Sequence, residues 1–330
     1  TYSEFKQALS ELKSKGMERL IIDLKDNPGG YLDRATKIAD ELLDGNKMIV
    51  YTDGKDGRYD SEIRANVKGE FEKGPVIVLI NEGSASASEI VSGALQDNDR
   101  ALIVGRRSFG KGLVQMPIPL SDGSELRLTI SRYYTPCGRS IQKPYNPNNT
   151  EDYNSDLLKR YQHGEFFHAD SIHFIDSLKY KTLTGRTVYG GGGIMPDIFV
   201  PRDTSAYTNY LIELFNRNIV REYTLDYYST HKDELSSYTL EEFRKNFVVT
   251  EQMLKDFVTL ASKSGVVYKE REYRKSKEFL KVNLKAYIAR SVWGNKGFYP
   301  IINEADEVFI QAMKHFDKAK QLEKAMAGMK

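Results

Sequence analysis

The stretch Val76-Ile-Val-Leu-Ile-Asn-Glu-Gly-Ser-Ala-Ser-Ala-Ser-Glu-Ile90 joins an apolar run to an amphipathic one. Residues 76 to 80 are all apolar, as is typical of a strand covered on both faces of its sheet. Apolar and small residues then recur at helical spacing, at Ala87, Ile90, Val91, Ala94 and Leu95. The stretch therefore predicts an α/β unit in which small residues turn a buried strand into a helix.

Further strands and helices are predicted on both sides of this unit. Strands are expected at 20–24, 48–52 and 101–104, and a hairpin over 113–133 turning at 121–124. Alternating strands and helices followed by a hairpin indicate a mixed sheet with helices packed on it.

Two regions depart from this alternation. Residues 142 to 184 are polar and show no clear period, so they are interpreted as an insertion. After Pro201 the apolar residues recur at helical spacing up to the end of the chain. We expect a first domain over residues 1–205, with its insertion at about 142–184, and a helical C-terminal region over 206–330.

Composition and charge exclude several classes of function. The chain has 330 residues and a formal net charge of +2, which gives no electrostatic argument for binding nucleic acid. Its single cysteine, Cys137, excludes an internal disulfide and a cysteine-based zinc site. His163, His168 and His173 recur every five residues, which does not place them on one helical face, so no metal site is expected. No phosphate-binding loop is present, and no cofactor is predicted.

Three serines lie at the predicted junction between strand and helix. A serine hydroxyl needs a base within hydrogen-bonding reach before it can act as a nucleophile. Ser86 lies one turn before Ile90 on the inward helical face, whereas Ser84 lies in the loop and Ser88 points to another face. Ser86 would also lie at the helix N-terminus, where free N–H groups can stabilise an oxyanion. The alternative is that Ser86 only caps the helix.

Lys111 is the candidate base, 25 residues after Ser86 and between Gly110 and Gly112. A lysine amine accepts a proton only when it is uncharged, which requires burial away from acidic partners. The alternative is an ordinary solvated surface lysine. Gln115 could orient the amine, but in a straight strand it would lie about 13 Å from Lys111, so this role requires a bend near Gly112. The alternative for Gln115 is a half-exposed strand residue.

The remaining candidates surround the serine. Gly29 and Gly30 follow a predicted strand and could present an N–H group to a substrate carbonyl, with the N–H of Ala87 as the second donor. Asp97 is three helical turns after Ser86, about 16 Å away. It is therefore expected to support the end of the helix near Arg100, not to contact the serine.

Five segments in this order resemble the C-terminal processing, or tail-specific, serine proteases. They are Leu20-Ile-Ile-Asp-Leu-Lys-Asp-Asn-Pro-Gly-Gly30, Ser84-Ala-Ser-Ala-Ser-Glu-Ile90, Val104-Gly-Arg-Arg-Ser-Phe-Gly-Lys-Gly-Leu-Val-Gln115, Tyr133-Tyr-Thr-Pro-Cys-Gly-Arg-Ser-Ile141 and Gly193-Ile-Met-Pro-Asp197. The combination is far more specific than any one segment.

This resemblance implies a role for each candidate residue. Ser86 would be the nucleophile, Lys111 the general base and Gln115 the residue that orients it. The N–H groups of Ala87 and of Gly29 or Gly30 would form the oxyanion hole, and Asp97 would have a supporting role.

The resemblance also implies a fold, a reaction and a cellular place. The fold would be a crotonase/ClpP-like core of stacked ββα units with a C-terminal helical region. The reaction would be cleavage of proteins near exposed, unstructured C-termini, in the periplasm or cell envelope of a bacterium. The expected partners are protein or peptide substrates, with a second copy of the chain as a further candidate and no nucleic acid.

The chain also departs from the family pattern. Family members usually carry a PDZ domain before the core, which is expected in the full-length protein and absent from this sequence. The insertion at 142–184 interrupts a segment that is usually short, and Cys137 occupies a position where serine is more usual. Two alternative functions stay open, a catalytically latent binding or scaffold protein and a non-hydrolytic crotonase-like enzyme.

Overall fold

The computed structural model describes residues 1–328 apart from 56, 147 and 149. Its contacts divide the chain into two compact units, one of residues 1–201 together with the C-terminal segment from Gln311, and one of residues 202–310. The first unit ends at Pro201, four residues before the end that the sequence predicts for the first domain. The C-terminal segment, expected to belong with the helical region, packs in the first unit instead.

A parallel sheet forms the centre of the first unit. Its strand order is β1-β4-β5-β10, and every neighbouring pair is parallel. The strands are β1 (Leu20–Asp23), β4 (Val76–Ile80), β5 (Ala101–Gly105) and β10 (Ile198–Phe199). All residues of β4 and β5 are buried, as their apolar sequences predict.

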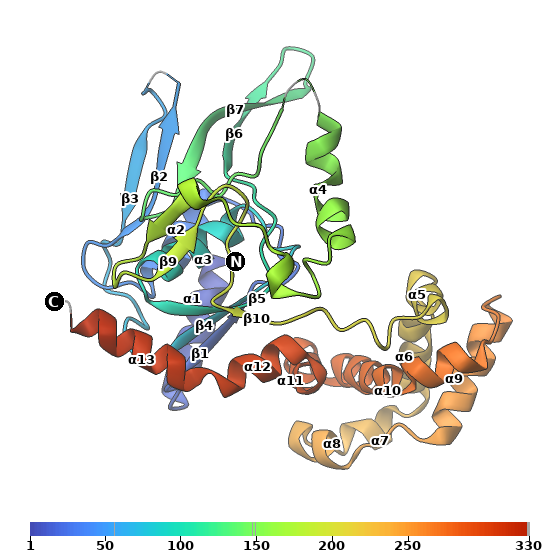
Figure 1. Cartoon of the computed structure of the whole chain (residues 1–330). Helices are drawn as coiled ribbons and strands as arrows, with labels where there is room; N and C mark the ends of the chain where they lie inside the picture. Colours follow the sequence, from blue (N-terminus) through green and yellow to red (C-terminus); the bar gives the residue numbers. More distant parts are fainter. Residues whose placement is uncertain (56, 147, 149, 329–330) are drawn as a thin grey trace. The chain divides into compact units, whose positions relative to one another are not determined.

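Helices cover this sheet and connect its strands (Figure 1). They are α1 (Tyr2–Ser14), α2 (Leu32–Asp40), α3 (Ala87–Asp97) and, from the C-terminal segment, α13 (Phe316–Ala327). All residues of α3 are buried, and this helix packs against α2 and β5. Helix α13 packs against β4 and β5, which explains why its segment belongs to the first unit.

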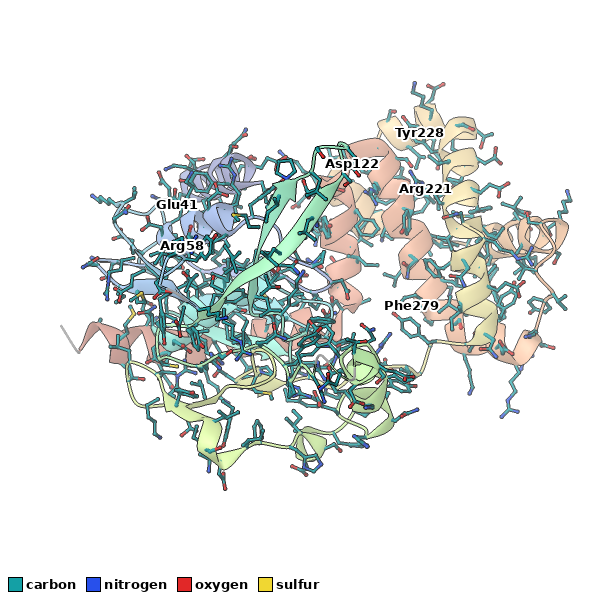
Figure 2. The ribbon with its side chains drawn as sticks, turned by 90° about the horizontal axis from the view of Figure 1, so that it is seen from above. Glu41, Arg58, Asp122, Arg221, Tyr228 and Phe279 are labelled. Carbon is teal, nitrogen blue, oxygen red and sulfur yellow. The ribbon has the colours of Figure 1, made fainter. Side chains whose placement is uncertain are left out.

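A second, antiparallel sheet has the strand order β3-β2-β7-β6. Its strands are β2 (Met48–Gly54), β3 (Ser61–Arg64), β6 (Leu113–Pro119) and β7 (Glu125–Tyr134). Strands β6 and β7 form the expected hairpin, and the side chain of Asp122 in its turn accepts hydrogen bonds from the N–H and the hydroxyl of Ser124 (Figure 2). The pairing of β6 shifts register between Val114 and Gln115, which bends the strand.

The insertion contains regular structure that its sequence does not reveal. It holds α4 (Thr150–Gln162), η1 (Ala169–Ser171), η2 (Asp176–Leu178) and β8 (Lys179–Lys181), which pairs with β9 (Thr187–Tyr189). Within α4 the buried residue is Arg160. Because the inward position carries a charged residue, hydrophobic periodicity could not identify this helix.

The second unit is helical and has its own core. Its elements are α5 (Asn209–Asn216), α6 (Ile219–Thr230), α7 (Lys232–Ser236), α8 (Leu240–Asn246), α9 (Glu251–Lys263), α10 (Glu270–Trp293), α11 (Asn295–Ile302) and η3 (Asn303–Ala305), and α12 (Glu307–Lys314) leads back to the first unit. Phe257, Leu280 and Leu284 are fully buried in its core. The predicted α/β fold class with a helical C-terminal region is therefore confirmed. Among the described residues, no helix is long and apolar enough to cross a membrane.

Candidate active site

Three loops meet at the carboxyl edge of the parallel sheet. They follow β1, β4 and β5, and ligand sites in open α/β sheets lie at this edge. Hydrogen bonds join them, since Ala85 N–H donates to Asn27 O at 3.0 Å and Phe109 N–H donates to Ser84 O at 2.9 Å. The sheet therefore brings together the glycine loop, the serine junction and the lysine loop, which are distant in sequence.

Ser86 adopts a strained backbone conformation directly before α3. Its φ of 53° and ψ of −113° lie in a region that L-residues rarely adopt, at a cost of about 1–3 kcal/mol. A sharp turn of this kind between a strand and a helix exposes the nucleophile of α/β-hydrolases. Here it occurs without the Gly-x-Ser-x-Gly pattern that usually marks such a turn. Ser86 thus lines a cleft at the N-terminus of a buried helix.

Ser84 and Ser88 have different roles from Ser86. The hydroxyl of Ser84 donates to Leu24 O at 2.7 Å, and that of Ser88 donates to Asn27 O at 2.9 Å. Both hydroxyls therefore tie the serine junction to the loop that follows β1. This supports the choice of Ser86 among the three candidates.

A glycine keeps the space beside Ser86 open. At Gly29, with a φ of +97°, an added Cβ would lie 2.6 Å from Ala87 N and 3.0 Å from the Cβ of Ser86. Any side chain here would collide with the backbone beside the predicted oxyanion donor. The N–H of Gly29 itself donates to Asn27 Oδ1 at 2.9 Å, so it is engaged inside the loop. The N–H of Gly30 has no such acceptor among the described residues, which favours Gly30 over Gly29 as the second donor.

One buried carboxylate joins the serine to the lysine loop. Glu89 is completely buried, and its Oε2 accepts from the N–H of Ser86 and from the N–H of Lys111, each at 2.8 Å. Its Oε1 accepts from Ser108 Oγ at 2.5 Å and from Gly110 N–H at 2.7 Å. Because the backbone nitrogens of Ser86 and Lys111 both lie 2.8 Å from the same oxygen, the distance between them is at most twice 2.8 Å.

The sequence analysis did not assign a role to Glu89. A signal was present, because Ser86 and Glu89 have the spacing of a capping box. Burial raises the pKa of Glu89, and the four hydrogen-bond donors act against that rise. All four groups donate, so they fit the ionised carboxylate.

Tyr133 is a second residue that the sequence analysis missed. It lies in β7 and is only 2% exposed, and its hydroxyl donates to Lys111 O. Burial raises the pKa of Tyr133 well above its ordinary value, while a hydrogen bond with the Ser86 side chain lowers it. The phenol therefore stays protonated and lies between the serine and the lysine backbone. No local pattern could have identified it, because its role depends on how two distant loops meet.

Lys111 and Gln115 line the same cleft as Ser86. This cleft has a volume of about 460 Å³, and its walls include Tyr31, Ile90 and Tyr133. No histidine is among the described residues that line it. Lys111 and Gln115 also line a neighbouring cleft of about 890 Å³. The register shift in β6 lies between Val114 and Gln115, two residues beyond the bend near Gly112 that the role of Gln115 requires, and Gln115 itself is exposed.

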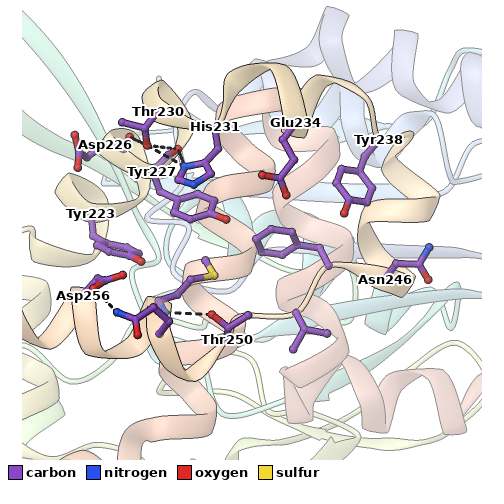
Figure 3. A pocket seen from close by; sticks show the side chains of 14 residues that line it. Tyr223, Asp226, Tyr227, Thr230, His231, Glu234, Tyr238, Asn246, Thr250 and Asp256 are labelled. Atoms are coloured by element: carbon purple, nitrogen blue, oxygen red, sulfur yellow. Dashed lines mark hydrogen bonds between the residues drawn. The ribbon is translucent and has the colours of Figure 1, made fainter.

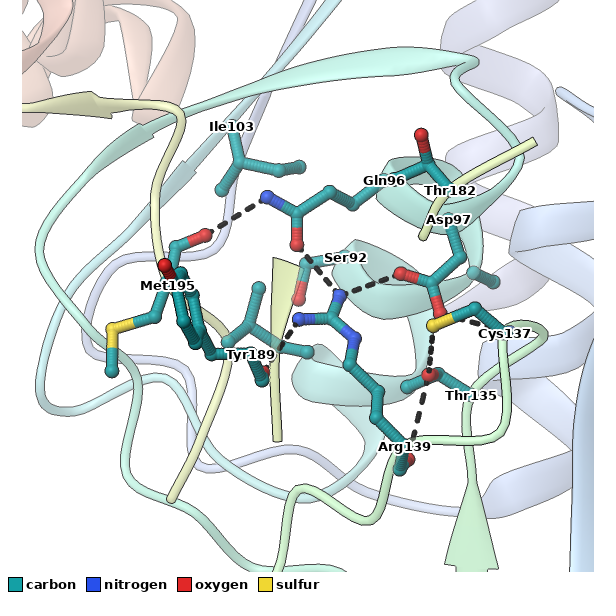
Figure 4. Close-up of polar contacts among 12 residues, drawn as sticks. Ser92, Gln96, Asp97, Ile103, Thr135, Cys137, Arg139, Thr182, Tyr189 and Met195 are labelled. Carbon is teal, nitrogen blue, oxygen red and sulfur yellow. Dashed lines mark hydrogen bonds and ion pairs between the residues drawn. The ribbon is translucent and has the colours of Figure 1, made fainter. Parts of the chain in front are cut away.

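Asp97 lies in a separate buried network at the far end of α3 (Figure 4). Its Oδ1 accepts from Arg139 Nη2 at 2.7 Å, and both side chains are fully buried. The Oδ2 of Asp97 accepts from Cys137 N–H at 3.2 Å. Its partner is thus Arg139 and not Arg100, whose guanidinium donates to the carbonyls of Leu42, Phe71 and Gly74. Because α3 separates Asp97 from Ser86, the contacts of Asp97 hold the helix end.

The second unit has a concavity of its own, with a volume of about 640 Å³ (Figure 3). Aromatic and acidic side chains line it, among them Tyr223, Tyr227, Asp226 and Glu234. No serine or lysine is among the described residues that line it. It therefore does not offer the chemistry found beside Ser86.

Loss of the Glu89 charge should impair the site strongly. A Glu89→Gln variant carries an NH₂ group in place of one carboxylate oxygen. Whichever way the amide is turned, this donor faces other donors, either the N–H of Gly110 or those of Ser86 and Lys111, so hydrogen bonds are lost. Hydrogen bonds to charged groups are worth about 1.5–3 kcal/mol, so we expect kcat to fall about 10- to 100-fold. Glu41→Gln changes another buried glutamate, remote from the three loops, and should leave kcat near the wild-type value. A wild-type kcat in the Glu89 variant would contradict this role.

Two family models match separate parts of the chain. Residues 1–151 match the family model of peptidase family S41. Residues 210–294 match a family of unknown function, DUF8443.

Named relatives match the same part of the chain. The carboxy-terminal-processing protease of Bartonella bacilliformis is 46% identical over 146 residues, and the carboxyl-terminal-processing protease of Synechocystis is 44% identical over 142 residues. Each alignment covers 43% of this chain and 33% of the relative, so the match spans about a third of the length of these relatives. Among solved structures, a photosystem II D1 C-terminal processing protease is 27% identical with a TM-score of 0.42, over 62% of this chain and 40% of that one.

Proposed function

We propose that the protein is a serine endopeptidase in which Ser86 is the nucleophile and Lys111 the general base. The observation that carries this proposal is the shared hydrogen-bond acceptor. One buried oxygen of Glu89 binds the backbone of both residues, and Ser86 has the strained turn of an exposed nucleophile. A lysine that merely faced solvent would not need its backbone N–H bound to the same carboxylate oxygen as that of Ser86.

The reaction has two stages. The uncharged amine of Lys111 takes the proton of the Ser86 hydroxyl, whose oxygen attacks the substrate carbonyl. The N–H groups of Ala87 and Gly30 stabilise the oxyanion, and the lysine returns the proton to the leaving amine. Water then attacks the acyl-enzyme carbonyl with Lys111 again acting as base, and the bond to the Ser86 oxygen breaks as the lysine returns the proton to that oxygen. In this scheme Gln115 orients the amine, and Asp97 supports the helix that presents Ser86.

We further propose that the substrates are proteins with exposed, unstructured C-termini. Support comes from the names of the relatives, which are carboxy-terminal-processing proteases, and from the apolar walls of the cleft. The proposed location is the cell envelope or periplasm of a bacterium.

A fluorophosphonate probe and an unstructured peptide test this function in the full-length protein. We expect the probe to modify Ser86, located by peptide mapping, and the peptide to be cleaved near its C-terminus. A non-hydrolytic crotonase-like enzyme would give neither result. A latent scaffold protein would fold normally and cleave no peptide.

A further inference from the structure

The loop that carries Lys111 is held from two sides. This base loop, residues 106–112, connects β5 to β6. On its inner side, Glu89 binds Ser108, Gly110 and Lys111 as described above. On its outer side it contacts the start of the insertion and α4, to which the proposed reaction assigns no role.

Arg160 of α4 binds the backbone of the base loop directly. Its Nη1 donates to Ser108 O at 3.0 Å, and its Nη2 donates to Arg107 O at 2.8 Å. Its Nε donates to Glu165 Oε1 at 2.9 Å, and the Glu165 carboxylate also pairs with the Arg107 side chain. Arg160 and Glu165 are each 5% exposed. The planar fork of an arginine presents its donors in fixed directions from three nitrogens, which suits two carbonyls and a carboxylate at once, whereas the donors of a lysine all lie on one nitrogen.

The first residues of the insertion bind the other half of the loop. Lys143 N–H donates to Gly110 O at 3.0 Å, and Gln142 Oε1 accepts from Gly112 N–H at 2.9 Å. The ammonium of Lys143 lies 4.1 Å from the ring centres of Phe109 and Tyr153, and it donates to Tyr153 O at 2.9 Å. These contacts connect the base loop to the first turn of α4.

The base loop needs such support because of its own sequence. Gly110 and Gly112 flank Lys111, and glycine leaves the backbone more freedom than any other residue. Positioning errors of about 1 Å can lower a reaction rate about 100-fold. A base carried on a glycine-rich loop therefore requires contacts that fix its backbone on both sides.

We propose that residues 142–143 and 150–165 act as a clasp that fixes the position of Lys111, with Arg160 as the main positioning residue. This inference rests on the proposed function, since it assigns a role to the base. Arg160 lines neither the cleft of Ser86 nor the neighbouring cleft, whereas Gln142 and Tyr153 of the clasp line the neighbouring one. Replacing Arg160 should therefore affect the rate of the chemical step and not substrate binding.

The test compares Arg160→Met with Lys159→Met in the full-length protein. Lys159 is the adjacent residue of α4, is 48% exposed and pairs with Asp152 at the surface. We expect Arg160→Met to lower kcat about 10- to 100-fold with KM within twofold of wild type. The rate at which a fluorophosphonate modifies Ser86 should fall by the same factor. Lys159→Met should retain the wild-type kcat and KM.

Active-site titration and thermal unfolding separate positioning from simple loss of folded protein. If the clasp positions Lys111, then Arg160→Met molecules that are folded and whose Ser86 reacts in the titration should still turn over slowly. If kcat per titrated site equals that of wild type, the inference is overturned, although the proposed function stands. If Ser86→Ala cleaves substrate as fast as wild type, the proposed function fails, whatever Arg160→Met does.

Discussion

Replacing Ser86 with alanine should abolish peptide cleavage by the full-length protein and leave the fold intact. In the proposed reaction this hydroxyl is the attacking group, and loss of a catalytic serine can lower kcat by on the order of 10⁶-fold. The hydroxyls that tie the serine junction to the loop after β1 are those of Ser84 and Ser88, which bind Leu24 and Asn27, and both stay in place. Cleavage of an unstructured peptide, followed by mass spectrometry, measures the loss.

Two other variants serve as controls for Ser86→Ala. Ser88→Ala loses one structural hydrogen bond, so it should lower stability by about 1 kcal/mol and retain most of the activity. Ser86→Gly should be inactive but more stable than Ser86→Ala by roughly 1 kcal/mol, because glycine adopts the positive φ without strain. Thermal unfolding measures both differences. An active Ser86→Ala variant would refute the assignment of the nucleophile.

Replacing Lys111 with methionine produces the second large effect. Methionine keeps much of the apolar length of lysine but cannot accept a proton. General base catalysis contributes about 10²–10⁴-fold, and we expect kcat to fall by a factor in this range. Lys55 lines the neighbouring cleft that Lys111 also lines, so Lys55→Met is a matched control that should retain activity. Steady-state kinetics of both variants test the assignment of Lys111 as the base. Equal values of kcat for Lys111→Met and Lys55→Met would contradict it.

The candidate residues of the cleft could be proposed from the sequence more readily than the residues that hold their backbones in place. Ser86 and Lys111 could be proposed because a nucleophile at a helix start and a lysine between glycines are local features. Tyr133 and Arg160 could not, because their roles depend on contacts between segments that are distant along the chain. Glu89 is intermediate, since its capping spacing was visible but its bond to the Lys111 backbone was not.

The fold shows the same limit. The buried strands β4 and β5 were predictable from uninterrupted apolar residues. Helix α4 was not, because its buried residue is Arg160 and not an apolar one. For α13, the sequence shows that one face is apolar, as at Phe316, but cannot show that this face packs on β4 and β5 of the first unit.

The central claim is that an amine at position 111 takes the proton of Ser86. It can be tested by changing the basicity of that amine in a Lys111→Cys, Cys137→Ser variant. Cys137 is the only cysteine of the chain, so aminoethylation of this variant modifies position 111 alone within it. S-aminoethylcysteine resembles lysine in length, but its amine is less basic.

The deciding measurement is the pH dependence of kcat/KM for this modified protein beside Cys137→Ser alone. For Cys137→Ser, activity should rise with pH over the alkaline range, because only the uncharged amine accepts a proton. Aminoethylation should restore activity to the inactive double variant and move this rise to lower pH. If the rise stays at the same pH after the exchange, or is centred near pH 6.5 as for a histidine, Lys111 is not the base.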